Sequence, residues 1–177
     1  MKIQIIQPYA TDKKYGIELN RCIETMPDDD WVCVLDWDCM LLSHNQIPMM
    51  YEYIARYPDT GLFLAMSNRS GSQMQRYKNQ KSENFDMSYW MREAENIEPS
   101  YNVTNMGAPI ISGFLMLFSK ATWAQIKFDE TLDILHVDRT FAQSVLHLRK
   151  KVHIMQDILV WHSYRLLNGT KDKSHLL

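Results

Sequence analysis

The chain has 177 residues, a length that fits one folded domain with a sizeable buried core. Hydrophobic residues make up 46% of it and charged residues 23%, and this balance excludes a chain that is disordered throughout. The formal net charge of -2 excludes binding of nucleic acid through overall charge, because contacts to phosphates need a basic surface, and we expect no nucleic-acid partner.

Three cysteines, Cys22, Cys33 and Cys39, are an odd number without the pair spacing of a metal site. We therefore expect a reducing compartment. The first 14 residues contain an apolar stretch that is too short and too mixed for a signal peptide, and no apolar run approaches the length of a membrane span. The sequence predicts one cytoplasmic domain over residues 1–177, and it leaves peripheral association with a membrane surface open.

Strand and helix patterns alternate in the N-terminal part of the chain. Residues 3–6 form a short apolar run that predicts a strand, and residues 15–26 place apolar side chains at helical spacing. Residues 31–35 are nearly all apolar, which is typical of a strand covered on both faces. A second helix is expected over residues 49–57 and a second buried strand over residues 61–66.

The C-terminal part continues the alternation after a long polar segment. Residues 67–86 show little periodicity and are expected to form a functional or disordered loop. An apolar segment within residues 110–118, a helix over residues 137–150 and strands over residues 152–155 and 158–161 come next. The alternation predicts the α/β fold class, a sandwich of helices around a mostly parallel central sheet.

Asp36 and Asp38 form the sharpest local motif, because they follow the apolar run of residues 31–35. Alternate residues of an extended chain point to the same side, so the two carboxylates share one face. Ligands of α/β sheets bind beyond the carboxyl ends of strands, and a divalent cation relieves the repulsion between two such carboxylates. The pair predicts a magnesium or manganese site, although a solvated acidic turn would have the same pattern.

Several segments are similar, in the same order, to those of GT-A glycosyltransferases. In that fold a helix start with glycine and asparagine precedes a buried strand that ends in Asp-x-Asp. Three further parts follow in that fold. They are a strand and helix on the acceptor side, a helix that opens with an acidic residue, and a terminal strand that ends in histidine. The corresponding segments here are residues 16–20, 29–38, 113–123, 137–149 and 158–162. The resemblance implies a three-layer GT-A-like sandwich.

The resemblance also implies a divalent cation, Mn²⁺ or Mg²⁺, that bridges the two phosphates of a nucleotide-sugar donor. Asp38 would be a direct ligand, Asp36 a partner through water or the ribose, and His162 a further ligand from the last strand. The cation would offset the charge that develops on the leaving diphosphate. Without the two aspartates, His162 would read as an ordinary histidine at a strand end.

Asp138 is the general base that the resemblance implies. It would take a proton from the hydroxyl of a glycan, lipid-linked or protein acceptor as that oxygen attacks the anomeric carbon, which inverts the configuration there. The family usually has a glutamate before this aspartate, where the chain has Val137. A helix N-cap is the alternative role of Asp138, because aspartate is favoured at that position.

Further residues are expected to bind the donor or the acceptor. Arg69 follows a strand end and could contact phosphate or sugar, and Arg165 follows His162 and could close over the diphosphate. Trp37, between the aspartates, could stack on a sugar or a base. A solvated loop charge is the alternative for Arg69, and a packing role is the alternative for Trp37. The resemblance adds three residues to the substrate-binding set: Gly16, Asn20 and Gly113.

Two other functions fit parts of the pattern. An Asp-x-Asp phosphatase or phosphotransferase would use one aspartate as the nucleophile, but that class expects a small hydroxyl residue where the chain has Met40. A catalytically silent module that binds sugars or nucleotides on a GT-A scaffold is the other alternative. The presence of Asp138 and His162 favours the transferase.

Overall fold

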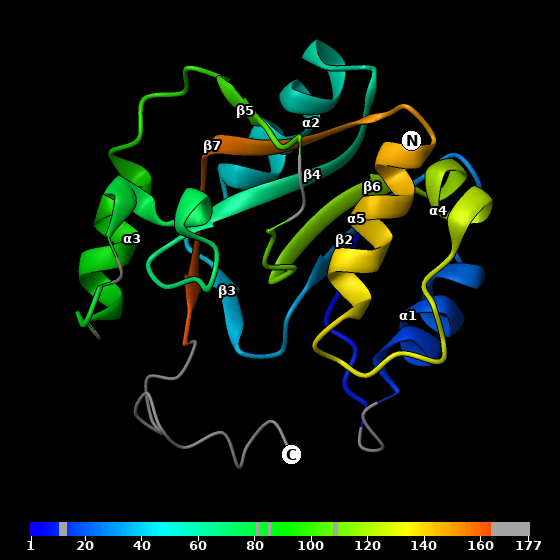
Figure 1. The fold of residues 1–177 in the computed structure, drawn as a ribbon. Coiled ribbons are helices and arrows are strands. Elements are labelled where there is room, and N and C mark those ends of the chain that lie inside the picture. The colour runs from blue at the N-terminus through cyan, green and yellow to red at the C-terminus, as the bar shows by residue number, and fades with distance from the viewer. Residues whose placement is uncertain (11–13, 81, 85, 108–109, 164–177) are drawn as a thin grey trace.

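The computed structural model describes residues 1–10, 14–80, 82–84, 86–107 and 110–163. In this part of the chain, seven strands form one sheet, accompanied by five α-helices and two short 3-10 helices (Figure 1). The elements are, in chain order, β1 (Ile3–Ile6), α1 (Tyr15–Glu24), β2 (Trp31–Leu35), β3 (Cys39–Leu41), α2 (Gln46–Arg56), β4 (Thr60–Ser67), η1 (Gln73–Gln75), η2 (Tyr77–Asn79), α3 (Met87–Glu95), β5 (Val103–Asn105), β6 (Leu115–Ser119), α4 (Lys120–Ile126), α5 (Val137–His147) and β7 (Lys151–His162).

The strands follow the order β1-β2-β6-β4-β7-β3, and β5 also pairs with β7. β1 with β2 and β4 with β7 are parallel pairs, whereas β2 with β6, β6 with β4, β3 with β7 and β5 with β7 are antiparallel. The α/β class is confirmed, but the sheet is mixed and not mostly parallel. An unbroken apolar run indicates burial on both faces, and it carries no information on the direction of the neighbouring strand.

Strand directions nevertheless bring several strand ends to one edge of the sheet. β6 is antiparallel to both β2 and β4, so β2 and β4 run the same way, and β1 and β7 run with them. The carboxyl ends of β2, β4 and β7 and the amino end of β6 therefore lie at the same edge. The residues at these ends, or within two residues of them, are Asp36, Asn68, His162 and Gly113.

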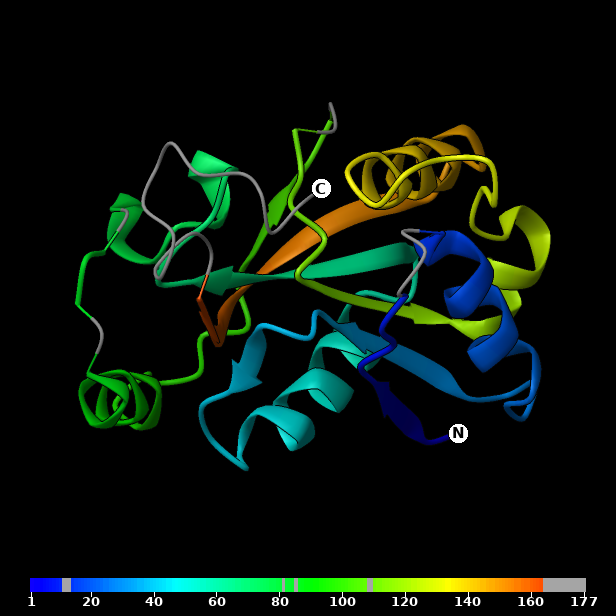
Figure 2. The ribbon, with the colours of Figure 1, turned by 90° about the horizontal axis from the view of Figure 1, so that it is seen from below.

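Helices cover both faces of the sheet (Figure 2). α1, α4 and α5 pack on one face through apolar side chains such as Leu19, Trp123 and Phe141, and α2 packs on the other through Met50 and Tyr53. Each fully buried side chain of this size contributes about 1.5–3 kcal/mol of hydrophobic stabilisation. The result is three layers with a buried core on each side of the sheet. No helix among the described residues is long and apolar enough to cross a membrane.

The two predicted C-terminal strands are one strand, β7, which spans twelve residues. Its register against β4 shifts between Ala65 and Met66. Asp157 lies beside this irregularity, and its buried carboxylate accepts hydrogen bonds from the Tyr53 hydroxyl at 2.8 Å and from the backbone N–H of Tyr101 at 2.5 Å. The polar residues Gln156 and Asp157 interrupt the apolar pattern, so the sequence predicted two strands where the structure has one.

Candidate active site

Asp36 follows the buried strand β2 at the edge of the sheet, and its backbone N–H donates to the carbonyl of Phe114 at 3.0 Å. The Tyr15 hydroxyl from α1 donates to Asp36 Oδ1 at 3.4 Å. Burial raises the pKa of Asp36 to about 8, and the charges of Asp38 and Asp138 add to the rise. Asp38 and Asp138 are thus both within electrostatic reach of Asp36, which carries a proton near neutral pH when no cation is near.

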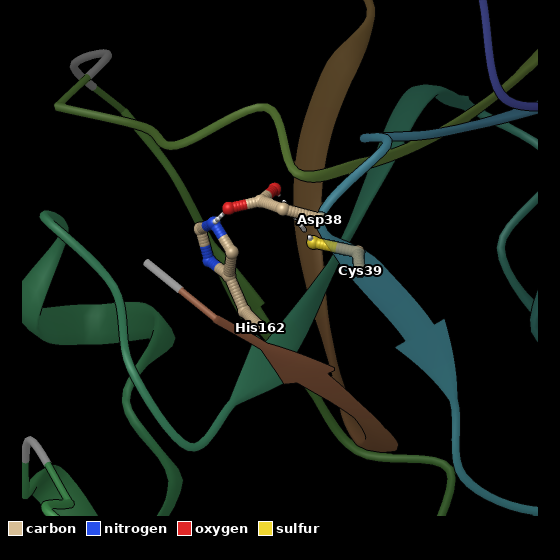
Figure 3. A group of neighbouring side chains, drawn as sticks. All are labelled: Asp38, Cys39 and His162. Carbon is tan, nitrogen blue, oxygen red and sulfur yellow. Dashed lines mark hydrogen bonds and ion pairs between the residues drawn. The ribbon is translucent and has the colours of Figure 1, made fainter. Parts of the chain in front are cut away.

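Asp38, in the turn between β2 and β3, has the opposite protonation state. Its Oδ2 lies 3.5 Å from His162 Nε2 and accepts a hydrogen bond from the Ser163 hydroxyl at 3.1 Å (Figure 3). Burial alone would raise the pKa of Asp38, but the hydrogen bond and charge of His162 and the bond from Ser163 outweigh it and lower that pKa. Asp38 is therefore an ionised carboxylate beside an imidazole, and both groups are metal ligands in proteins.

Strand pairing brings His162 to this carboxylate. β3 and β7 are antiparallel with Cys39 opposite His162, so the turn that carries Asp38 lies against the end of β7. The backbone N–H of His162 donates to Asn68 Oδ1 at 2.7 Å, and its ring packs against that of Phe114 with centroids 5.1 Å apart. His162 is 4% exposed, so the sheet and these two contacts determine the orientation of its imidazole.

Asp138 lies in the first turn of α5 and not at the N-cap, which is His136. Its Oδ1 accepts a hydrogen bond from the backbone N–H of Arg139, and its Oδ2 accepts one from that of Gly113, both at 2.7 Å. Burial raises the pKa of the Asp138 carboxyl, although the two backbone bonds oppose the rise. A carboxylate with a raised pKa is suited to take up a proton.

Gly113 makes room for this carboxylate. A β-carbon on Gly113 would lie 2.4 Å from Asp138 Cβ and 2.8 Å from Asp138 Oδ2, so only glycine fits at this position without displacing Asp138. The structure therefore gives Gly113 a positioning role behind Asp138. A direct contact between Gly113 and a substrate stays a prediction.

Gly16 and Asn20, which were predicted to bind substrate, make packing and hydrogen-bond contacts inside the fold. The Asn20 amide donates to the Phe128 carbonyl at 2.9 Å, and its oxygen accepts from the Trp123 indole at 2.9 Å. A β-carbon on Gly16 would lie 2.4 Å from the carbonyl oxygen of Asp129. Both residues hold α1 against the segment that follows α4. A glycine and an asparagine in one helix produce the same sequence pattern whether they pack or bind a ligand.

Arg69, predicted to contact phosphate or sugar, is turned into the protein and is only 1% exposed. Its Nη1 donates to the Ser82 carbonyl at 2.7 Å and lies 2.8 Å from Glu83 Oε1. These contacts fold the polar segment that follows β4, and that segment also contains η1 and η2. Arg69 is therefore engaged within the fold, and Arg165 lies outside the described residues.

Trp37 has an exposed ring, as a residue that stacks on a ligand requires. Its side chain lies in the turn between the two aspartates and is 58% exposed. The ring meets that of Tyr9 edge to face, with centroids 6.3 Å apart and an interplanar angle of 84°. Because Tyr9 is itself 67% exposed, a flat ligand could reach both rings from solvent.

Tyr15, Cys39 and Ser163 also contact the two aspartates, and none of the three was predicted from the sequence. The Cys39 thiol lies 3.8 Å from Asp38 Oδ1. Cys39 and Ser163 each adjoin a predicted ligand, and the pairing of β3 with β7 is the signal that would have linked them. Tyr15 has no such signal, because a tyrosine on the apolar face of a helix reads as a core residue.

No protein-family model matches the chain, and a search of curated proteins finds no match. The chemistry of the site is therefore argued from its residues. Asp38 and His162 offer an ionised carboxylate and an imidazole to a cation. Asp36 and Asp138, with raised pKa values, are suited to hold or move protons at the same edge of the sheet.

Proposed function

We propose that the chain is a metal-dependent GT-A glycosyltransferase that transfers a sugar from a nucleoside-diphosphate donor to a hydroxyl acceptor. One observation carries the proposal. A carboxylate–imidazole pair, Asp38 with His162, and a half-buried carboxylate with a raised pKa, Asp138, belong to one edge of the sheet around Asp36. Three layers, with β1, β2, β4 and β7 running toward that edge, support the family resemblance.

The donor atoms of the site fit a divalent cation. The ionised Asp38 carboxylate supplies oxygen and His162 Nε2 supplies nitrogen, 3.5 Å apart. Carboxylates suit manganese and magnesium, and an imidazole fits manganese better than magnesium. When bound, the cation would offset the charge that develops on the leaving diphosphate. Asp36, held by the Tyr15 hydroxyl, would contact it through water or the donor ribose.

Asp138 is the general base of the proposed reaction. The backbone N–H groups of Gly113 and Arg139 hold its carboxylate in one orientation, and the remaining lone pairs of its oxygens can accept the proton of an acceptor hydroxyl. Such a base typically contributes about 10²–10⁴-fold in rate. Direct attack of the activated hydroxyl inverts the configuration at the anomeric carbon.

The exposed ring of Trp37 supports a role in donor binding. Its position between Asp36 and Asp38 would let a base or sugar stack on it while the diphosphate lies beside the carboxylates. The acceptor hydroxyl would belong to a glycan, a lipid-linked sugar or a protein. These residues account for the transfer of a sugar to a hydroxyl group. The surface around Asp138 would determine which acceptor molecule binds.

Manganese-dependent release of free nucleoside diphosphate from sugar nucleotides tests the proposal. We expect slow release by the parent chain and none by Asp38→Asn, because that substitution removes the charged ligand. Asp59→Asn is the matched control, since its carboxylate is 81% exposed and pairs only loosely with Lys151 at 3.9 Å. A nucleotide with Mn²⁺ should also raise the melting temperature of the parent chain.

Three results would contradict the proposal or its metal site. Release of inorganic phosphate from the sugar nucleotide or from a phosphomonoester would indicate the phosphatase alternative. Binding of nucleotide with manganese, seen as a rise in melting temperature without any release, would indicate a silent binding module. Equal release by the parent chain and Asp38→Asn would place the metal elsewhere.

A further inference from the structure

Cys39 is a third metal-ligating side chain beside Asp38 and His162. One ligand atom of each residue, the Cys39 Sγ among them, lies within 4.8 Å of the other two. The Sγ atom is 3.8 Å from Asp38 Oδ1, and Asp38 Oδ2 is 3.5 Å from His162 Nε2. Ligand atoms around a tetrahedral zinc ion, with bonds of about 2.0–2.3 Å, lie about 3.3–3.8 Å apart. Small side-chain adjustments would therefore bring all three into coordination.

The backbone holds the three groups together. Cys39 and His162 are direct partners in the antiparallel pair of β3 and β7, and side chains at such positions point to the same face of the sheet. Figure 3 shows the carboxylate of Asp38 reaching from the preceding turn toward the same point. Cys39 is 7% exposed and His162 is 4% exposed, so the surrounding atoms restrict the rotation of both side chains.

We propose that Cys39 completes a three-residue site with Asp38 and His162 that prefers zinc and other thiophilic divalent cations to manganese and magnesium. The inference rests on the metal site of the proposed function, because Asp38 and His162 are shared, but it requires neither nucleotide nor sugar. Binding forms a sulfur–metal bond and breaks the S–H bond, and the proton leaves to solvent. The Asp38 carboxylate and the Cys39 thiolate then balance the two charges of the ion.

The number of ligands determines what such a site can do. Three protein ligands leave the fourth position of a tetrahedral zinc ion for water or a substrate oxygen, as in catalytic zinc sites. Cysteine sulfur is a soft donor that selects zinc, whereas manganese prefers oxygen. Cys39 thus decides which metal the site favours, while the open position would accept the same diphosphate oxygen in either case.

Titration of the full chain with Co²⁺, a spectroscopic substitute for Zn²⁺, tests the thiolate directly. We expect a sulfur-to-cobalt charge-transfer band that reaches its maximum at one ion per chain. The band should be lost in Cys39→Ser. The described chain holds two further free thiols, so the matched control is the double variant Cys22→Ser/Cys33→Ala, which keeps Cys39 and should keep the band.

Competition titrations provide a second measurement. Zn²⁺ affinity should fall by at least about 10–100-fold in Cys39→Ser, because even the outer partners of metal ligands typically contribute that much. Mn²⁺ affinity should change less than about threefold, since the carboxylate and imidazole remain. Cys39→Ala repeats both measurements without a buried hydroxyl. If both Cys39 variants unfold, the cobalt spectrum of the double variant Cys22→Ser/Cys33→Ala, which keeps the Cys39 thiol alone, is decisive.

The outcomes separate this inference from the proposed function. Cobalt that binds the parent chain without the sulfur band would show that the thiol is no ligand, and it would overturn the inference while the metal site itself stands. If neither Co²⁺ nor Mn²⁺ binds, both are overturned. A sulfur band without release of nucleoside diphosphate from any sugar nucleotide would support the zinc site and count against the transferase.

Discussion

The carboxylate of Asp138 lies so close to Gly113 that a β-carbon there would stand 2.4 Å from Asp138 Cβ. Gly113→Ala should therefore displace Asp138 and break its 2.7 Å hydrogen bond from the Gly113 backbone. We expect a loss of about 1–3 kcal/mol in the free energy of unfolding, as for other overpacked sites. Thermal and urea unfolding measure it.

Gly107→Ala is the control for that substitution. A β-carbon on Gly107 would meet no atom within 4 Å, so its stability should change by less than about 0.5 kcal/mol. If the two alanine variants had the same free energy of unfolding, the close packing of Gly113 on Asp138 would not contribute to stability.

Asp138→Asn tests the proposed general base. The amide keeps the size of the side chain and can still accept a hydrogen bond, but it cannot take a proton from an acceptor. We expect transfer to slow by about 10²–10⁴-fold while donor and manganese affinities stay near those of the parent chain. Single-turnover transfer and nucleotide binding are the paired measurements. Transfer at the parental rate would assign Asp138 a purely structural role.

Asn20→Ala should damage the fold and leave metal binding intact. The Asn20 side chain also accepts from the backbone N–H of Phe128 at 3.0 Å. Its removal takes the partner from two donors, this N–H and the Trp123 indole, and from one acceptor, the Phe128 carbonyl. Each such group costs about 1–3 kcal/mol, and we expect a total loss of about 2–4 kcal/mol in the free energy of unfolding.

The exposed Asn45 offers a matched asparagine-to-alanine change, since its side chain makes no cap hydrogen bond at the start of α2. Asn45→Ala should stay within about 0.5 kcal/mol of the parent chain. Metal affinity measured on folded Asn20→Ala should equal that of the parent chain, and a large fall would show that Asn20 contributes to the metal site.

His153 predicts acid sensitivity at the far end of the sheet. Burial first, and the charge of Lys151 second, lower its pKa below the usual 6.5. Below that value the unfolded chain binds a proton that the folded chain does not, so the stability present above about pH 6.5 is lost as the pH falls. Urea unfolding between about pH 7.5 and pH 5 should show this slope.

His153→Gln should flatten the slope, because glutamine can bond to Thr60, whose Oγ1 lies 2.8 Å from His153 Nδ1, without titrating. The comparison variant is His44→Gln, which changes an exposed histidine and should keep the parental slope. An unchanged slope in His153→Gln would assign the acid sensitivity to another group.

Several elements were predictable because their signals are local, whereas the three-residue strands β3 and β5 were not predicted. The apolar run at residues 31–35 is β2 within its exact bounds, and the helical spacing from Tyr15 onward is α1. Strand direction was not predictable, because β6 enters between β2 and β4 through contacts made far apart in the sequence. A pattern of burial reports what covers a strand and not which way its neighbour runs.

The sequence predicted the Asp-x-Asp motif of the candidate site but not the different environments of its two aspartates. Asp36 and Asp38 look equivalent in the sequence, yet burial raises the pKa of Asp36 while His162 and Ser163 lower that of Asp38. That difference depends on partners that the strand pairing supplies. Arg69 is a second example, because its sequence position does not show that it is 1% exposed or that its Nη1 lies 2.8 Å from Glu83 Oε1.

The two strands that carry the site should open at different rates, because β3 is short and β7 is long. His162 ends a twelve-residue strand that pairs with β3, β4 and β5, whereas Asp38 precedes a three-residue strand whose partner among the described elements is β7. Amide protons of central strands exchange only on global unfolding, while short end strands open on their own. Ions should therefore enter and leave as β3 and its turn lift from an intact sheet, at the rate of that local opening.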